Sequence, residues 1–220
     1  MRKYLAEIIG TFALVFCGTG AIIINQETGG VITHAGIATT FGLIVAAMIY
    51  TLGDISGAHF NPAVTIAFWV ARSFPGKEIM PYIISQFIGA IAASTTLHFL
   101  FPANILLGAT LPLGSDMQSF VMEIILSFIL MFTILHVAKG SKEQGMFAGL
   151  AIGSVVLLEA MFAGPISGAS MNPIRSLSPA IISGHLEHVW VYLTAPVLGA
   201  LFAVYCWIIL SDKRNIIKQD

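Results

Sequence analysis

Two asparagines, each followed by proline, stand at matched places in the sequence and are the first candidates for chemistry. The two triplets are Asn61-Pro62-Ala63 and Asn172-Pro173-Ile174. An asparagine before proline can cap a helix through its side-chain oxygen and still offer an amide N–H to a passing molecule. Arg175 adds a fixed positive charge and more donors three residues after the second asparagine. Such donors suit a neutral, oxygen-bearing molecule and repel cations.

The composition is that of a chain built for lipid. Hydrophobic residues make up 57% of the 220 residues, charged residues 10%, and the mean hydropathy is +0.90, whereas soluble domains carry roughly 25% charged residues. The formal net charge of −1 gives no reason to expect a nucleic-acid partner. Cys17 and Cys206 lie in apolar runs and indicate neither a disulfide framework nor a metal cluster. No catalytic motif is present, so we expect no enzyme, no cofactor and no metal.

Six apolar stretches are long enough to cross a bilayer, which takes about 20 residues. They cover roughly 5–25, 34–53, 81–101, 119–138, 145–163 and 189–210. Two shorter pieces, 61–71 and 172–182, each begin with Asn-Pro and predict half-helices. The fold class is therefore an all-α membrane protein, with six transmembrane helices and two re-entrant half-helices.

The sequence predicts a single domain, 1–220, built from two similar halves at approximately 1–102 and 115–211. "AEIIGTFALVF" matches "MEIILSFILMF", and "SGAHFNPAV" matches "SGASMNPIR". Each half has three full spans, so the second half enters the membrane inverted. The two half-helices are then expected to meet end to end near the bilayer midplane, at Asn61 and Asn172.

Basic residues predict the orientation. With six spans, nine of the ten fall on one side of the membrane; they are Arg2, Lys3, Arg72, Lys77, Lys139, Lys142, Lys213, Arg214 and Lys218. The positive-inside rule predicts that both termini lie in the cytoplasm. We expect the membrane to be the plasma membrane. Arg175 is the exception, which indicates that it has a role other than setting the orientation.

The residues before each asparagine are small and suit an extended segment whose carbonyls have no helical partners. Such backbone is tolerated at membrane depth where it is buried in protein or lines a watery cavity. We expect a ladder of carbonyl acceptors from Gly57, Ala58, His59, Gly168, Ala169 and Ser170.

The paired Asn-Pro half-helices and "SGAHFNPAV" resemble the aquaporin (major intrinsic protein) family over nearly the whole chain. "LGDISGAHFNPAVTIAF" and "AGPISGASMNPIRSLSPAI" are most similar to its nodulin-like branch and their bacterial relatives. The resemblance implies the aquaporin fold, a homotetramer with one pore in each protomer, and no cofactor.

The resemblance also implies a constriction on the outer side of the asparagine pair. Its four positions fall on Phe41, Ala160, Ala169 and Arg175. Strict water channels of the family usually carry histidine at the position of Ala160, and glycerol-type members carry glycine. Alanine there predicts a wider and less polar opening, whereas Phe41 keeps the bulky wall of the water channels.

Three further residues depart from family patterns. Ile174 replaces the usual alanine, and it could either push the half-helices apart or narrow their junction. Ser176 replaces the aspartate of glycerol facilitators, and Asp54 stands near the cytoplasmic mouth where many relatives have histidine.

Three acids fall inside predicted spans, where acids are functional candidates by default. The resemblance gives Glu7 and Glu123 a structural role, bracing the loop backbone. Glu159 has no counterpart in the first half. It either bonds an outer loop or braces the constriction, or it is a protonated core acid without a role in transport.

These features predict a passive channel for water and small uncharged solutes that excludes protons and ions. The solutes would be glycerol-like polyols, with urea and metalloid hydroxides as further candidates. A strict water channel is the main alternative, and a proton-coupled transporter using the buried acids is a second one. A third is an adhesive or structural membrane protein with a closed pore.

Overall fold

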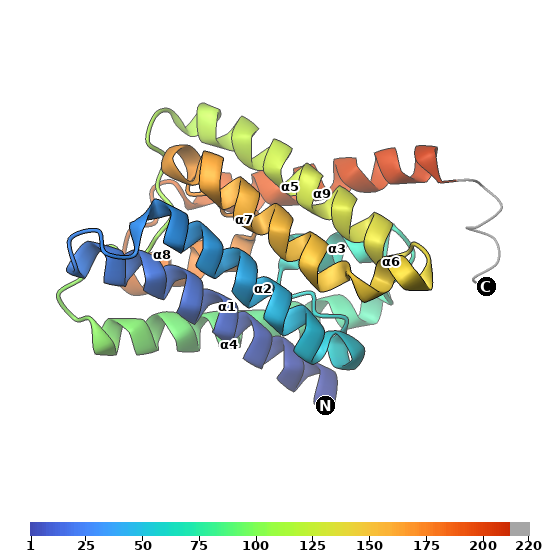
Figure 1. Cartoon of the computed structure of the whole chain (residues 1–220), viewed down its shortest axis with the longest axis horizontal. Coiled ribbons are helices and arrows are strands. Elements are labelled where there is room, and N and C mark those ends of the chain that lie inside the picture. Colours follow the sequence, from blue (N-terminus) through green and yellow to red (C-terminus); the bar gives the residue numbers. More distant parts are fainter. Residues whose placement is uncertain (212–220) are drawn as a thin grey trace.

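The computed structural model describes residues 1–211, and that part of the chain is helical (Figure 1). Within residues 1–211, six helices are long and apolar enough to span a membrane. They are α1 (Arg2–Glu27), α2 (Thr33–Ser56), α4 (Ile79–Leu100), α5 (Asp116–Ala138), α7 (Ala148–Ser167) and α9 (Val189–Leu210). Two shorter helices begin at the Asn-Pro prolines, α3 (Pro62–Val70) and α8 (Pro173–Ser183). The predicted fold class is confirmed.

The fifth predicted span differs most from the structure, because α7 begins at Ala148 and not near 145. Residues before it form a separate short helix, α6 (Lys142–Met146). Ser141 starts α6 with a capping box, in which its hydroxyl accepts from the Gln144 N–H and the Gln144 side chain accepts from the Ser141 N–H. A further turn of 3₁₀ helix, η1 (Gly76–Glu78), precedes α4.

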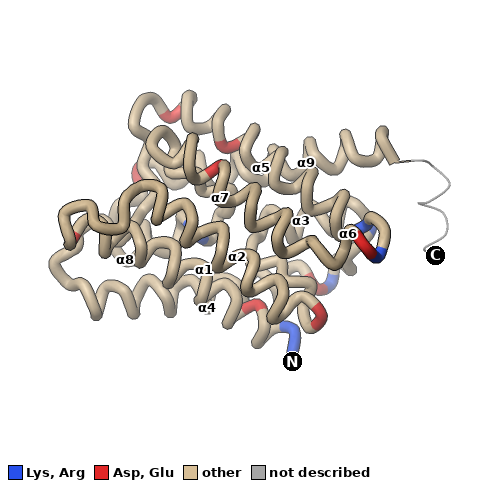
Figure 2. Tube along the Cα trace, in the orientation of Figure 1, with Lys and Arg blue, Asp and Glu red and all other residues tan. Residues whose placement is uncertain are grey.

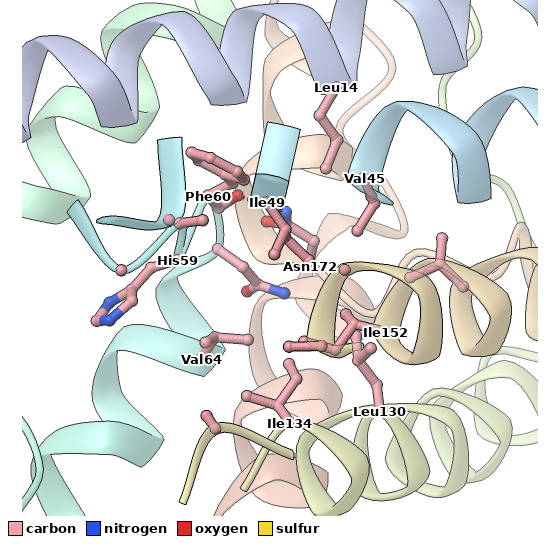
Figure 3. Close-up of a pocket in the computed structure, with 18 of the residues that line it drawn as sticks. Leu14, Val45, Ile49, His59, Phe60, Val64, Leu130, Ile134, Ile152 and Asn172 are labelled. Atoms are coloured by element: carbon pink, nitrogen blue, oxygen red, sulfur yellow. Dashed lines mark hydrogen bonds between the residues drawn. The ribbon is translucent and has the colours of Figure 1, made fainter. Parts of the chain in front are cut away.

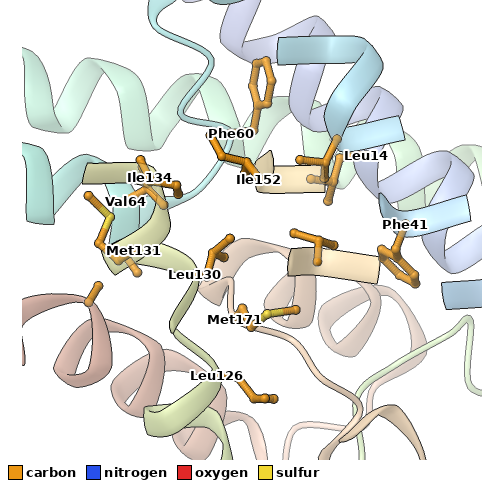
Figure 4. Packing of buried hydrophobic residues seen from close by; sticks show 14 of the residues in the cluster. Leu14, Phe41, Phe60, Val64, Leu126, Leu130, Met131, Ile134, Ile152 and Met171 are labelled. Atoms are coloured by element: carbon orange, nitrogen blue, oxygen red, sulfur yellow. The ribbon is translucent and has the colours of Figure 1, made fainter. Parts of the chain in front are cut away.

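The two half-helices are buried between the long ones. In the first half α1 packs on α2 and α4, in the second half α5 packs on α7 and α9, and α2 packs on α7 to join the halves. Both α3 and α8 contact α4 and α9, and they contact each other. Buried side chains from α1, α2, α5 and α7, such as Leu14, Phe41, Leu130 and Ile152, surround this centre (Figure 4).

Glycines set the distance between the long helices. A methyl group on Gly89 of α4 would stand 2.3 Å from the Ile8 carbonyl oxygen of α1, and one on Gly199 of α9 would stand 2.2 Å from that of Ile124. Both contacts lie within the chain.

Replacing Gly89 with alanine is therefore expected to destabilise the protein. Overpacking of this kind costs about 1–3 kcal/mol, because backbone of α1 and not a mobile side chain blocks the new methyl group. The measurement is thermal unfolding in detergent. Gly53→Ala in α2 is the matched control, since nothing lies within 4 Å of its added methyl. Equal melting temperatures for the two variants would contradict the close approach.

Most of the described basic residues lie at one end of the helix bundle. Figure 2 shows Lys and Arg near the N-terminus and α6, at one end of the bundle. Arg2 begins α1, Lys77 lies in η1 and Lys142 begins α6. Lys213, Arg214 and Lys218, which the sequence placed on the same side, lie outside the described residues. Arg175 lies in α8, in the interior, where it is 2% exposed.

Candidate functional site

Each half-helix is capped by the asparagine that precedes it. The Asn61 Oδ1 accepts from the Ala63 N–H at 2.9 Å. The Asn172 Oδ1 accepts from the N–H groups of Ile174 at 3.1 Å and Arg175 at 3.4 Å. Proline takes the first helical position in both, where its missing N–H would have no helical partner. The positive ends of both helices therefore stand at the asparagines.

The two asparagines also hold the opposite loop. Asn61 donates from Nδ2 to the Met171 carbonyl at 2.7 Å, and Asn172 donates from Nδ2 to the Phe60 carbonyl at 2.8 Å. Figure 3 places Asn172 beside Phe60. Because each amide has two N–H groups, one remains for another acceptor. The sequence reasoning missed Phe60 and Met171; their place directly before each asparagine was the available signal.

The loop before α3 is held by Glu7 of α1. Its carboxylate accepts four hydrogen bonds, from the Ser56 hydroxyl, the N–H groups of His59 and Phe60, and the Gln86 amide, at 2.7–3.0 Å. In the second half, Glu123 of α5 accepts three, from the Ser167 hydroxyl and the N–H groups of Ser170 and Met171, each at 2.8 Å. Both acids are fully buried.

These loops need such support because their backbone is strained. Ala58 and Phe60 have φ values of 51° and 49°, and Ala169 and Met171 have 40° and 54°. Residues with a Cβ rarely adopt this left-handed conformation, which persists only where the surroundings impose it. Because every second residue is left-handed, the loop carbonyls do not form helical hydrogen bonds. The loop N–H groups instead donate to the carboxylates of Glu7 and Glu123.

One cavity of about 740 Å³ runs past both asparagines. Five of the six predicted carbonyl residues line it, and they are Gly57, Ala58, His59, Ala169 and Ser170. Gly168 is not in that lining and instead ends α7. The opposite wall is apolar, with Leu14, Val45, Ile49, Leu130 and Ile152 facing the space in Figure 3. The cavity thus has one hydrogen-bonding side and one apolar side.

The residues after the asparagines are buried beside this cavity and do not line it. They are Pro62, Ala63, Pro173 and Ile174. Ile174 is part of the apolar core. Since the two asparagine–carbonyl bonds are 2.7 and 2.8 Å long, Ile174 neither separates the loops nor narrows the lining.

Four residues from different elements line this cavity. Phe41 comes from α2, Ala160 from α7, Ala169 from the second loop and Arg175 from α8, and all four line the space. The Arg175 guanidinium lies 5.0 Å from the centroid of the Phe41 ring, a cation–π contact. Arg175 also donates from Nη1 to the Gly108 carbonyl at 3.3 Å.

Two residues that the sequence reasoning missed position Phe41 and Arg175 at their end of the cavity. Gly108, in the loop between α4 and α5, supplies the carbonyl for Arg175. Gly18 of α1 makes room for Phe41, because a methyl group there would stand 2.1 Å from the ring. At the other end the lining includes Tyr50 and Asp54 of α2 and Lys142 of α6.

Comparison with known proteins identifies the group to which this arrangement belongs. The family model described as "Major intrinsic protein" matches residues 1–207. This chain belongs to the major intrinsic protein family.

Its relatives within that family include plant members. The chain is 48% identical over 220 residues to "Aquaporin NIP1-1" of Oryza sativa subsp. japonica, covering 100% of this chain and 78% of that protein. It is 45% identical to "Nodulin-26" of Glycine max, covering 97% and 80%. Among solved structures, the aquaglyceroporin from Plasmodium falciparum superposes with a TM-score of 0.85 at 26% identity, covering 95% and 96%. The resemblance read from the two Asn-Pro motifs is confirmed.

Proposed function

We propose that this chain is a passive membrane channel for water and small uncharged solutes such as glycerol, and that it excludes protons and ions. The observation that carries the proposal is a continuous cavity whose lining includes Asn61, Asn172, Phe41, Ala160, Ala169 and Arg175. Membership of the major intrinsic protein family and the likeness to an aquaglyceroporin support it.

The lining explains how a neutral solute would be carried. Loop carbonyls offer acceptors on one side, and the free amide N–H groups of Asn61 and Asn172 offer donors at the middle. The opposite wall is hydrocarbon and binds the carbon edge of a polyol. A molecule with hydroxyls along one edge exchanges its water hydrogen bonds for these without a change of charge.

Exclusion of cations has two sources in the proposed mechanism. The positive ends of α3 and α8 both point at the asparagines, and each carries roughly half an elementary charge. Arg175 adds a full charge at the constriction. A hydrated proton that follows the water through the cavity meets both.

The proton-coupled alternative loses support from the bonding of the acids. Glu7 and Glu123 already accept four and three hydrogen bonds from the loops they hold. Protonation would break part of that support, so neither acid is free to carry a proton in each cycle. These contacts favour the bracing role that we propose for both.

Four family properties complete the proposal. We propose a homotetramer in which each protomer has its own pore, in the plasma membrane, with both termini in the cytoplasm. The six described basic residues outside the interior, at one end of the bundle, support this orientation. Mass measurement in mild detergent tests the tetramer, and a mass near one protomer would contradict it.

The function is tested by osmotic swelling and shrinking of proteoliposomes, followed by stopped-flow light scattering. Water flux is measured with sucrose, and solute entry with glycerol, urea and boric acid. We expect fast water flux and measurable glycerol flux that ignore both membrane potential and pH gradient. Dependence on a proton gradient would favour the transporter. Rejection of all three solutes would leave a strict water channel, and no flux would leave a closed structural protein.

Ala160→His is expected to suppress glycerol entry much more than water flux. The histidine ring adds bulk and a polar group opposite Arg175, and a single file of water needs less width than glycerol. We expect the glycerol-to-water ratio to fall by about tenfold, which corresponds to 1.4 kcal/mol. Ala163→Ser serves as the control, since Ala163 is buried in the same helix and does not line the cavity. An unchanged ratio in Ala160→His would remove Ala160 from the constriction.

A further inference from the structure

A third buried acid, Glu159 of α7, has no role in the channel described above. It is 0% exposed, and neither of its carboxyl oxygens has a hydrogen-bond partner within the described residues. The Ser127 hydroxyl of α5 is 2% exposed and equally without a partner there. Unpaired polar groups at membrane depth are costly, so such a group calls for a partner.

Glu159 and Ser127 lie at the same depth on neighbouring helices. Helices α5 and α7 pack on each other. Eleven residues separate Ser127 from the end of α5 at Ala138, and eleven separate Glu159 from the start of α7 at Ala148. At 1.5 Å per residue, each lies roughly 16 Å from the ends that α6 joins. Both side chains are buried, and they stand at matching distances along two helices that pack on each other.

Comparison of the two halves indicates what is missing beside Glu123. The Tyr82 hydroxyl donates to the Ser56 carbonyl, and the Tyr192 hydroxyl donates to the Ser167 carbonyl. These equivalent bonds show which residues of the two halves correspond to each other. Four residues after these tyrosines stand Gln86 and Pro196. The Gln86 amide gives Glu7 its fourth hydrogen bond. Pro196 has no side-chain donor, so Glu123 lacks that bond.

At another position the second half carries a polar side chain where the first half carries an apolar one. Eight residues before Ser56 stands Met48, and eight residues before Ser167 stands Glu159. The half that loses an amide donor near its bracing acid therefore gains a carboxyl group. Glu123 stands four residues before Ser127 in α5, so the two side chains lie one turn apart on the same face of that helix. Two buried carboxylates beside Ser127 would repel each other. Only one of the two acids is then expected to be ionised.

We infer that Glu159 is a neutral carboxylic acid and, with Ser127, holds water between α5 and α7 that gives Glu123 the hydrogen bond that Gln86 gives Glu7. The two oxygens of Glu159, the Ser127 hydroxyl and the open acceptor of Glu123 provide the polar contacts that a buried water needs. Glu123 is the ionised member, because its three bonds all come from donors.

Glu159 is thus a positioning residue for the constriction. It acts through Glu123 on the N–H groups of Ser170 and Met171, and so on the strained loop that carries Ala169. This goes beyond the proposed function, and it holds whichever solute passes.

Infrared spectroscopy of the reconstituted full chain at neutral pH tests the protonation state. We expect a carboxylic acid C=O band in the wild type that is absent in Glu159→Gln. Ser127→Ala should shift that band, because it removes one hydrogen-bond partner. Identical carboxylic acid bands in the wild type and Glu159→Gln would overturn the inference. If Ser127→Ala left the frequency of this band unchanged, the inference that Glu159 and Ser127 share a water would be wrong.

Amide hydrogen exchange tests the action on the loop. Glu159→Met gives the second half the side chain that the first half has at this position. We expect exchange in segment 167–172 to rise about fivefold, as expected for the loss of one hydrogen bond, while Glu159→Gln, which keeps a donor, stays near the wild type. Segment 56–61, held by Glu7 and Gln86, is the internal control. Unchanged exchange in Glu159→Met, or an equal rise in both segments, would overturn the positioning role. If Glu159→Met does not fold, Ser127→Ala carries the same comparison.

Discussion

Arg175→Val is expected to leak protons or small cations while it still passes water and glycerol. A unit charge at 4 Å contributes about 4 kcal/mol at an effective dielectric constant of 20, so its loss should raise proton conductance at least about tenfold. Valine also frees the Gly108 carbonyl and ends the contact with Phe41, so the constriction widens slightly. The measurement is proton flux into proteoliposomes loaded with a pH-sensitive dye.

The matched control for this variant is Arg175→Lys, which keeps the charge but loses the planar donor set. We expect Arg175→Lys to exclude protons as the wild type does and to differ from it in glycerol flux. Thermal unfolding verifies that both variants are folded. Unchanged proton conductance in a folded Arg175→Val channel would mean that the ends of α3 and α8 are sufficient barriers, and the role assigned to Arg175 would be wrong.

The fold could be predicted from the sequence because lipid imposes simple rules. Apolar length gave the six spans, and Pro62 and Pro173 marked the starts of the half-helices. The start of α7 was placed a few residues too early, since hydropathy does not separate the capped turn of α6 from the span that follows it.

The site could be predicted only in part. Asn61, Asn172 and Arg175 stood out because polar groups in apolar surroundings are costly and therefore informative. The carbonyls of Phe60, Met171 and Gly108 carried no such signal, because every residue has a carbonyl and only the folded backbone selects among them.

Side-chain packing was equally hidden from the sequence. Whether Ile174 narrows the junction depends on the space behind it, and the structure places it in the core beside intact asparagine bonds. The match between Gly18 and the Phe41 ring joins two helices and leaves no local pattern. For Glu159, sequence reasoning left open a direct bond to an outer loop, and the described residues offer it none.

Removal of either bracing acid is expected to have the largest effect on stability. Glu7→Leu takes the acceptor from four donors and Glu123→Leu from three. Each buried donor left unpaired costs about 1–3 kcal/mol, so the loss approaches the whole stability of a typical protein, about 5–15 kcal/mol. The strained loops at Phe60 and Met171 would also lose the groups that hold them.

We therefore expect neither leucine variant to yield a monodisperse protein at the temperature at which the wild type is stable, as measured by size-exclusion chromatography after heating. Glu7→Gln and Glu123→Gln keep one carbonyl acceptor each and should melt between the wild type and the leucine variants. Glu187→Leu, at an exposed acid in the loop before α9, is the control and should melt as the wild type does. If the leucine variants melted with this control, the loops would hold their shape without the acids. Glu7 and Glu123 would then be free to titrate, and the proton-coupled alternative would regain its support.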